Sequence, residues 1–132
     1  PDIEEEIRVG DNVFLNKIVT IEIESAAELS DSKNVNKKFA INYLDYDKIQ
    51  GKVVLRNRRN GDKIQLLNRN FDSSVKKLFN AKIPLDERSH QIFLVDEAGI
   101  IFIEGFGISD RIKIDDKTER ILKIIIDGSV SD

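Results

Sequence analysis

Apolar and polar residues alternate in short stretches along much of this chain, and a period of two indicates β-strands. The stretch Lys17–Ser25 alternates in this way, which predicts a strand that is buried on one face and carries its carboxylates in water. A short apolar run at 13–15 precedes it, so we expect a hairpin that turns through Asn16.

Further strands are predicted by the same alternation or by short apolar runs. Residues 92–95 and 100–103 flank the turn sequence Asp-Glu-Ala-Gly, and their unbroken apolar character predicts a hairpin buried on both faces. The pair Asn60-Gly61 between residues 52–56 and 63–67 is a strong hairpin signal, because both residues accept positive φ. The other expected strands are 39–46, 111–114 and 120–126.

Only one or two short helices are expected. Val75, Leu78 and Phe79 fall at positions i, i+3 and i+4, which is the apolar stripe of a helix. Asp72 or Ser73 can cap this helix, because a short oxygen side chain accepts from the first free backbone N–H groups. The fold is therefore predicted to be mainly β, a β-sandwich or barrel of short strands.

Composition limits the class of protein. The chain has 132 residues, enough for one domain with a core, and its 40% hydrophobic and 34% charged residues are typical of a globular protein. It has no cysteine and one histidine, which excludes thiolate metal sites and makes a metal site of any kind unexpected. No apolar run approaches the roughly 18–20 residues of a membrane helix, and no signal-peptide pattern opens the chain. We expect a cytoplasmic protein without membrane contact. The starting proline and the lack of any Met lead us to expect a piece of a longer protein.

Charge is distributed unevenly along the chain, whose net charge is −3. Residues 1–31 contain two basic and nine acidic side chains, a balance of −7, whereas residues 52–82 contain nine basic and two acidic ones, a balance of +7. Basic side chains neutralise phosphates and release counterions, so the segment 52–82 is a candidate for binding nucleic acid. A solvated edge strand, whose charge discourages pairing with other sheets, explains the same composition. Composition alone leaves both interpretations open.

Position within the predicted elements adds detail to the basic segment. A pleated strand would direct Arg56 and Arg58 to one face and Arg59 to the other. Lys76 and Lys77 lie near the start of the predicted helix, where the helix dipole already favours an anion, so two lysines there suggest a function.

Several other residues have structural interpretations. Asp62 is expected to brace its turn by pairing with a neighbouring arginine, and His90 is expected to be a surface residue. Aromatic residues make up only 7% of the chain, which favours recognition of a double-stranded stem through shape and phosphates over stacking on single strands. The acidic segment 1–31 is expected to face away from the nucleic acid or to contact another domain.

A set of short motifs occurs in a distinctive order. They are Tyr46-Asp47-Lys48, Leu55-Arg56-Asn57-Arg58-Arg59-Asn60-Gly61-Asp62-Lys63-Ile64, Lys76-Lys77-Leu78-Phe79, Lys82-Ile83-Pro84, Arg88, Phe93-Leu94-Val95, Ile103-Glu104-Gly105 and Ile108-Ser109. In this order and spacing they resemble the C-terminal domain of bacterial tRNA(Ile)-lysidine synthetase, best over residues 45–126. Each motif is common alone, and the ordered combination carries the resemblance.

The resemblance implies a fold and a role. The fold is a β-sandwich that this domain shares with part of the phenylalanyl-tRNA synthetase β subunit. The family's enzyme uses ATP to activate the wobble cytidine of tRNA(Ile) and attaches lysine to it. That chemistry, with ATP and Mg, belongs to an N-terminal domain that has an S-G-G-x-D-S loop, and the C-terminal domain binds the acceptor-stem end of the tRNA.

The chain as a whole, residues 1–132, is then expected to be the single C-terminal tRNA-binding domain of a longer enzyme. It contains no glycine-rich phosphate loop, so we expect neither catalysis nor a cofactor in this fragment. The expected partners are tRNA(Ile) and the other domains of the parent synthetase, and a homodimer of that parent is compatible with the resemblance. An alternative is a protein–protein docking module whose basic patch contacts another domain.

The predicted tRNA-binding residues are the basic ones in or near the matching motifs: Arg56, Arg58, Arg59, Lys63, Arg69, Lys76, Lys77 and Arg88. One stretch departs from the family pattern. The family usually has a proline and glycines where this chain has residues 65–74, which lack both. A backbone contact to phosphate is therefore not expected there, and Arg69 could replace it with a side chain.

Overall fold

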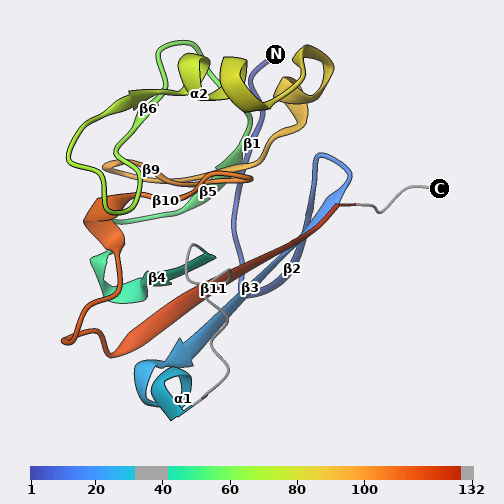
Figure 1. Cartoon of the computed structure of the whole chain (residues 1–132). Coiled ribbons are helices and arrows are strands. Elements are labelled where there is room, and N and C mark those ends of the chain that lie inside the picture. The colour runs from blue at the N-terminus through green and yellow to red at the C-terminus, as the bar shows by residue number, and fades with distance from the viewer. Residues whose placement is uncertain (32–41, 129–132) are drawn as a thin grey trace.

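Two antiparallel sheets packed face to face form the body of the protein (Figure 1). The computed structural model describes residues 1–31 and 42–128. The five-stranded sheet has the order β1 (Glu4–Glu6), β5 (Val54–Arg56), β8 (Phe93–Asp96), β9 (Gly99–Ile103) and β10 (Gly107–Ile108). The four-stranded sheet has the order β2 (Gly10–Phe14), β3 (Lys17–Ser25), β11 (Arg120–Asp127) and β4 (Tyr43–Asp45). The predicted mainly β sandwich is confirmed.

Helical elements and a small third sheet complete the described chain. The two α-helices are α1 (Ala26–Asp31) and α2 (Val75–Lys82), and the 3₁₀ turns are η2 (Tyr46–Lys48), η3 (Leu85–His90) and η4 (Asp110–Ile112). The third sheet pairs β6 (Lys63–Ile64) with β7 (Ser73–Ser74). Figure 1 shows α2 on the outer side of the five-stranded sheet and α1 at the opposite end of the molecule. Among the described residues, no helix has the length and apolar character needed to cross a membrane.

The five-stranded sheet is buried on both faces, as its apolar runs predict. Leu94 and Ile101 belong to the core shared with the four-stranded sheet, whereas Phe93 and Ile103 belong to a second core under α2. Because successive side chains of a strand point to opposite faces, one pair of strands serves both cores. Helix α2 packs against the outer face of the sandwich through this second core.

Two predicted hairpins are confirmed. The β2–β3 hairpin turns at Leu15 and Asn16, which have φ of 50° and 60°, the left-handed values that a tight two-residue turn requires. The β8–β9 hairpin is closed by Asp96, whose Oδ1 accepts from the backbone N–H of Ala98 at 2.9 Å and of Gly99 at 3.1 Å. In both hairpins, the residues that determine the turn geometry lie within three positions of one another in the sequence.

The hairpin predicted at Asn60-Gly61 is wrong. Strand β5 pairs with β1 and β8 instead, and β6 pairs with β7. Gly61 does have the positive φ of a turn residue, 84°. The turn nevertheless carries the chain out of the five-stranded sheet, because both edges of β5 are already occupied.

Other expected boundaries also change. The strand predicted at 111–114 is wrong, because the chain there forms η4, in which the Ser109 hydroxyl accepts from the Arg111 N–H at 3.4 Å. The predicted helix at 75 is confirmed as α2, but Ser74 is its N-cap, and Ser73 pairs with β6. The strand predicted at 120–126 is confirmed as β11. Of the strand predicted at 39–46, Tyr43–Asp45 form β4 and residues 39–41 lie outside the described residues.

Candidate nucleic-acid interface

The basic segment forms the outer layer of the molecule, around α2 and the β6–β7 pair (Figure 1). Val75 and Phe79 are fully buried, and the Phe79 ring lies 5.9 Å from that of Phe93, edge to face. This contact confirms that the apolar stripe of α2 belongs to the core. It also fixes the orientation of the helix, so that Lys76 and Lys77 are exposed to solvent.

Arg56 is held inside this layer by an acidic partner. Its guanidinium makes two hydrogen bonds to the Asp62 carboxylate, at 2.9 and 3.0 Å, and lies 5.4 Å from the Phe93 ring. Both side chains of the pair are less than a tenth exposed. The expectation that Asp62 braces the turn by pairing with an arginine is confirmed. The contact of Arg56 with tRNA stays a prediction, and it would require this buried guanidinium to leave its carboxylate partner.

Arg59 is also paired, with the acidic N-terminal strand. Its guanidinium lies 2.6 Å from a Glu4 carboxylate oxygen and 3.7 Å from one of Asp2, and its backbone N–H donates to Asp62 at 2.8 Å. The first strand of the acidic segment therefore lies beside the basic segment. Contact of Arg59 with a ligand would require it to exchange these carboxylates for phosphate.

Three of the predicted residues converge on one groove. Lys63, Arg69 and Lys77 line an open groove of about 900 Å³ between α2 and the loop that follows β6. Lys76 is exposed on the same helix but does not line the groove. In the described part of the chain, none of these four cations has a carboxylate within ion-pair distance.

The last two predicted residues lie at a smaller hollow. Arg58 and Arg88 line it together with Arg59. The Arg88 guanidinium donates to the Ile83 carbonyl and to the Asn80 side chain, both at 2.8 Å, which ties the end of α2 to η3. Arg58 lies over the Phe79 ring at 5.7 Å. Both arginines keep their positive charge without a carboxylate partner among the described residues.

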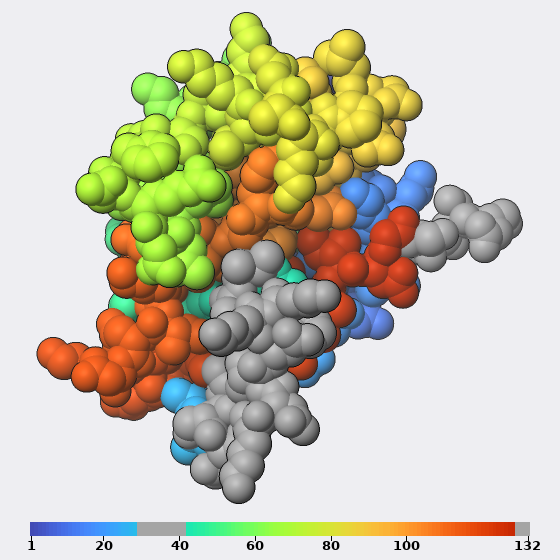
Figure 2. Space-filling model, in the orientation of Figure 1, coloured from blue at the N-terminus to red at the C-terminus, as the bar shows by residue number. Residues whose placement is uncertain are grey.

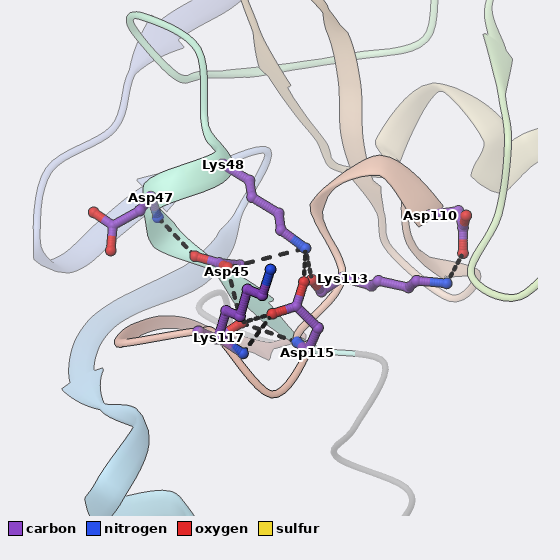
Figure 3. Close-up of polar contacts among 8 residues, drawn as sticks. Asp45, Asp47, Lys48, Asp110, Lys113, Asp115 and Lys117 are labelled. Carbon is purple, nitrogen blue, oxygen red and sulfur yellow. Dashed lines mark hydrogen bonds and ion pairs between the residues drawn. The ribbon is translucent and has the colours of Figure 1, made fainter.

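Several basic residues elsewhere on the protein are paired with carboxylates. Figure 3 shows Lys48 between two elements, donating to the Asp115 carboxylate at 2.8 Å and to the Lys113 carbonyl at 2.6 Å, while Lys113 pairs with Asp110 at 3.4 Å. Further ion pairs join Lys17 to Glu104, Arg111 to Asp96 and Arg120 to Asp47. The unpaired cations around α2 therefore create a local positive field, which attracts a polyanion even though the net charge is negative.

The glycine-poor loop at 65–74 is anchored to the body of the protein by its backbone. The Asn68 N–H donates to the Asp110 carboxylate at 2.9 Å, and the Leu67 N–H donates to the Ile108 carbonyl at 3.0 Å. The hydrogen bond from Asn68 is the main reason that the pKa of Asp110 is lower than usual. Asn68 adopts a left-handed φ of 62°, a backbone conformation that glycine usually provides. These contacts fix the position from which Arg69 extends.

Sequence reasoning missed two residues of the groove. Phe71 lines it and is 55% exposed, and its only signal was that it stands isolated in a polar stretch. Lys82 also lines it, donating to the Gly105 carbonyl at 2.8 Å and lying 5.1 Å from the Phe106 ring. Lys82 follows Leu78 by one helical turn, and both residues therefore lie on the side of α2 that faces the groove. No group of three or more metal-binding side chains gathers among the residues that the structure describes.

Comparison with known proteins gives one family. Residues 53–125 match the family described as the TilS substrate C-terminal domain. Over 126 residues the chain is 31% identical to the tRNA(Ile)-lysidine synthase of Clostridium tetani, an alignment that covers 95% of this chain and 27% of that protein. The chain thus spans about a quarter of the length of this curated relative.

Two solved structures have the same fold. One is described as the TILS C-terminal domain, with a TM-score of 0.75 and 20% identity over 99% of this chain and 100% of that one. The other is an N-terminal fragment of the phenylalanyl-tRNA synthetase β subunit from Pyrococcus horikoshii, with a TM-score of 0.59 and 14% identity over 87% of this chain and 39% of that one. The predicted relation of the fold to the synthetase β subunit is confirmed.

Proposed function

Because the chain belongs to the family of TilS substrate C-terminal domains, we propose that it is the tRNA-binding module of a tRNA(Ile)-lysidine synthase. The observation that carries the proposal is the set of four exposed cations without carboxylate partners among the described residues: Lys63, Arg69, Lys76 and Lys77. An exposed lysine or arginine that lacks an acidic neighbour can exchange its counterion for a phosphate, and the released counterion supplies the affinity.

The acceptor stem of tRNA(Ile) is the ligand we assign to this surface. A double-stranded RNA stem presents regularly spaced phosphates, and proteins recognise it mainly through shape and backbone contacts. Lys76 and Lys77 contact the phosphates directly from the first turn of α2, and Arg58 and Arg88 extend the same surface past the end of the helix. Arg56 and Arg59 support this surface from within through their carboxylate partners.

The chemistry of lysidine formation is assigned to the rest of the parent enzyme. The chain contains no glycine-rich loop that could cradle the phosphates of ATP. This domain contributes binding energy at a site far from the reacting cytidine. That binding energy holds the tRNA in position for the catalytic domain. The parent enzyme acts where tRNA is found, in the cytoplasm.

The proposal is tested by the affinity of the chain for a tRNA(Ile) transcript, measured by fluorescence anisotropy. The double reversal Lys76→Glu/Lys77→Glu should weaken binding by at least about tenfold, because it replaces two phosphate contacts with repulsion. The matched control Arg8→Glu/Lys117→Glu makes the same change in charge at two exposed positions away from α2. Far-UV circular dichroism checks that both variants remain folded.

The result that contradicts the proposal is equal loss in both double variants, or no loss in either. Equal loss would mean that the negative net charge of the variants, and not a defined surface, controls binding. Retained binding in the α2 variant would favour the alternative that this basic surface docks onto an acidic domain of the parent protein.

A further inference from the structure

Phe71 differs in its surroundings from the other phenylalanines that the structure describes. Phe79 and Phe93 are fully buried in the core under α2, whereas Phe71 is 55% exposed in the loop between β6 and α2. In Figure 2 this part of the chain forms a green lobe beside the yellow-green surface of α2. Phe71 belongs to neither hydrophobic core of the protein.

The groove beside Phe71 combines an apolar floor with a positive rim. Leu78 and Phe106 contribute apolar surface, and Phe106 is held in place by stacking on Phe79 with ring centroids 5.5 Å apart. The charged residues that line the groove are Lys63, Arg69, Asp72, Lys77 and Lys82, which is four positive charges against one negative, or +3. An apolar protein segment would gain nothing from this charge.

A double-stranded stem does not fit both properties of the groove. Its phosphates can approach the lysines, but its bases are stacked inside the helix and cannot reach an exposed ring. An unpaired nucleotide presents a flat apolar base together with a charged phosphate, and proteins that bind single strands combine basic grooves with aromatic stacking surfaces. Charge and shape therefore favour a single-stranded nucleotide as the occupant.

We propose that this groove binds an unpaired nucleotide of the RNA, with its base stacked on Phe71 and its phosphates beside Lys63 and Lys77. The guanidinium of Arg69, 5.9 Å from the centre of the Phe71 ring, adds a planar cation to the stacking site. The inference rests on the proposed function, since it requires that the chain binds RNA, and it adds a single-stranded site to the stem-binding surface. It departs from the expectation from composition, which favours recognition of a double-stranded stem over stacking on single strands.

The residues of this site are positioned before any ligand arrives. Lys63 is held by the β6–β7 pairing, in which it lies opposite Ser74. The backbone contacts of Leu67 and Asn68 hold the loop that leads to Phe71. A preformed site loses little conformational entropy on binding, which makes even one stacked base measurable.

The test compares two RNA hairpins that share one stem, the first blunt and the second with a short single-stranded 3′ extension. Each is titrated against the unmodified chain and against Phe71→Ala, Phe71→Trp and the control Val13→Ala. Val13 is a similarly exposed apolar residue, at 61%, on the edge strand β2 of the four-stranded sheet. Because Phe71 is outside both cores, its substitution should leave the fold intact.

The unmodified chain should bind the extended hairpin about tenfold more tightly than the blunt one, the range expected for one stacked base. Phe71→Ala should remove this preference without changing the affinity for the blunt hairpin. Phe71→Trp should restore the preference, since tryptophan also offers a flat aromatic face, and Val13→Ala should behave like the unmodified chain.

Equal affinity of the unmodified chain for both hairpins overturns the single-stranded site but leaves the proposed function standing, provided that binding still depends on Lys76 and Lys77. A preference that survives in Phe71→Ala also overturns it. If the unmodified chain binds neither hairpin nor tRNA, the proposed function fails and this inference fails with it.

Discussion

Arg56 and Lys77 are basic residues of one segment, and their surroundings give them different tasks. Arg56 is buried between Asp62 and the Phe93 ring, so its charge supports the fold. Lys77 is exposed, lines a groove and has no carboxylate partner in the described part of the chain, so its charge remains available to a ligand. The nearest acidic group, and not the positive charge itself, distinguishes structural from binding residues.

The buried pair predicts a specific stability effect. Asp62→Ala should lower the free energy of unfolding by about 3–5 kcal/mol, because it leaves the Arg56 guanidinium buried without a partner. Removing both charges in Arg56→Met/Asp62→Leu should cost less than removing one. Urea unfolding measures both variants, with Asp72→Ala as the control at an exposed carboxylate, where the change should stay within about 0.5 kcal/mol. A loss in Asp62→Ala no larger than in the control would contradict the pairing.

Two carboxylates predict how stability depends on pH. Burial alone would raise the pKa of Asp96, but the hydrogen bonds from Arg111 and from backbone N–H groups outweigh it and lower that pKa below 3.8. The pKa of Asp110 is lowered mainly by the N–H of Asn68. A lowered folded-state pKa means that the stabilisation is complete above the unfolded pKa and is lost as pH falls through the folded one.

The free energy of unfolding should therefore decrease as pH falls below about 5 and should continue to decrease as pH passes through the lowered pKa of Asp96 and of Asp110. Asp96→Asn should be less stable at neutral pH and should show a shallower decrease, since it has lost one of the titrating groups. Urea unfolding at a series of pH values measures the slope. An identical slope in Asp96→Asn and the unmodified chain would show that Asp96 contributes nothing to the pH dependence.

Helix α2 is the element that orients the binding surface. Its buried residues Val75 and Phe79 attach it to the five-stranded sheet, and its first turn then presents Lys76 and Lys77 outward. Ser74 begins the helix, with its hydroxyl accepting from the Lys77 N–H at 3.5 Å. The orientation of the binding surface follows from the way the helix starts and packs.

The position of the cap can be tested with two neighbouring serines. Ser74→Ala should cost about 0.5–1 kcal/mol of unfolding free energy, because the first turn of α2 loses its side-chain acceptor. Ser73→Ala should cost less, because Ser73 contributes to β7 through its backbone. Thermal or urea unfolding compares the two. A larger cost at Ser73 would mean that the helix begins one residue earlier.

Sequence patterns predict those elements whose partners are close in the chain. The β2–β3 and β8–β9 hairpins and α2 are local, and all three are confirmed. The Asn60-Gly61 turn was recognised, but a turn does not determine which strands pair on either side of it. The partners of β5 come from residues 4–6 and 93–95, which no local signal indicates.

The same limit applies to the candidate site. The excess of basic residues and the exposure of Lys76 and Lys77 could be predicted from charge and helical spacing. The neutralisation of Arg59 could not, because Asp2 and Glu4 reach it only through the pairing of β1 with β5. Phe71 was missed because aromatic residues usually indicate a core, and only the fold shows that this one lies outside it.

The whole molecule gathers unpaired positive charge in one layer. The basic residues around α2 cover the outer face of the five-stranded sheet (Figure 1), although the acidic strand β1 belongs to that same sheet and its Glu4 pairs with Arg59. A chain with a net charge of −3 can therefore bind a polyanion, because the local field and not the total charge governs the encounter.

The most direct test of this account is the salt dependence of tRNA affinity. The logarithm of the association constant should fall linearly with the logarithm of salt concentration, and Lys76→Gln/Lys77→Gln should reduce the slope by about 1.4–1.8, since each lost phosphate contact removes about 0.7–0.9. The control Arg8→Gln/Lys117→Gln should keep the slope of the unmodified chain. A flat salt dependence, or one slope shared by all three proteins, would contradict the assignment of this surface to phosphate binding.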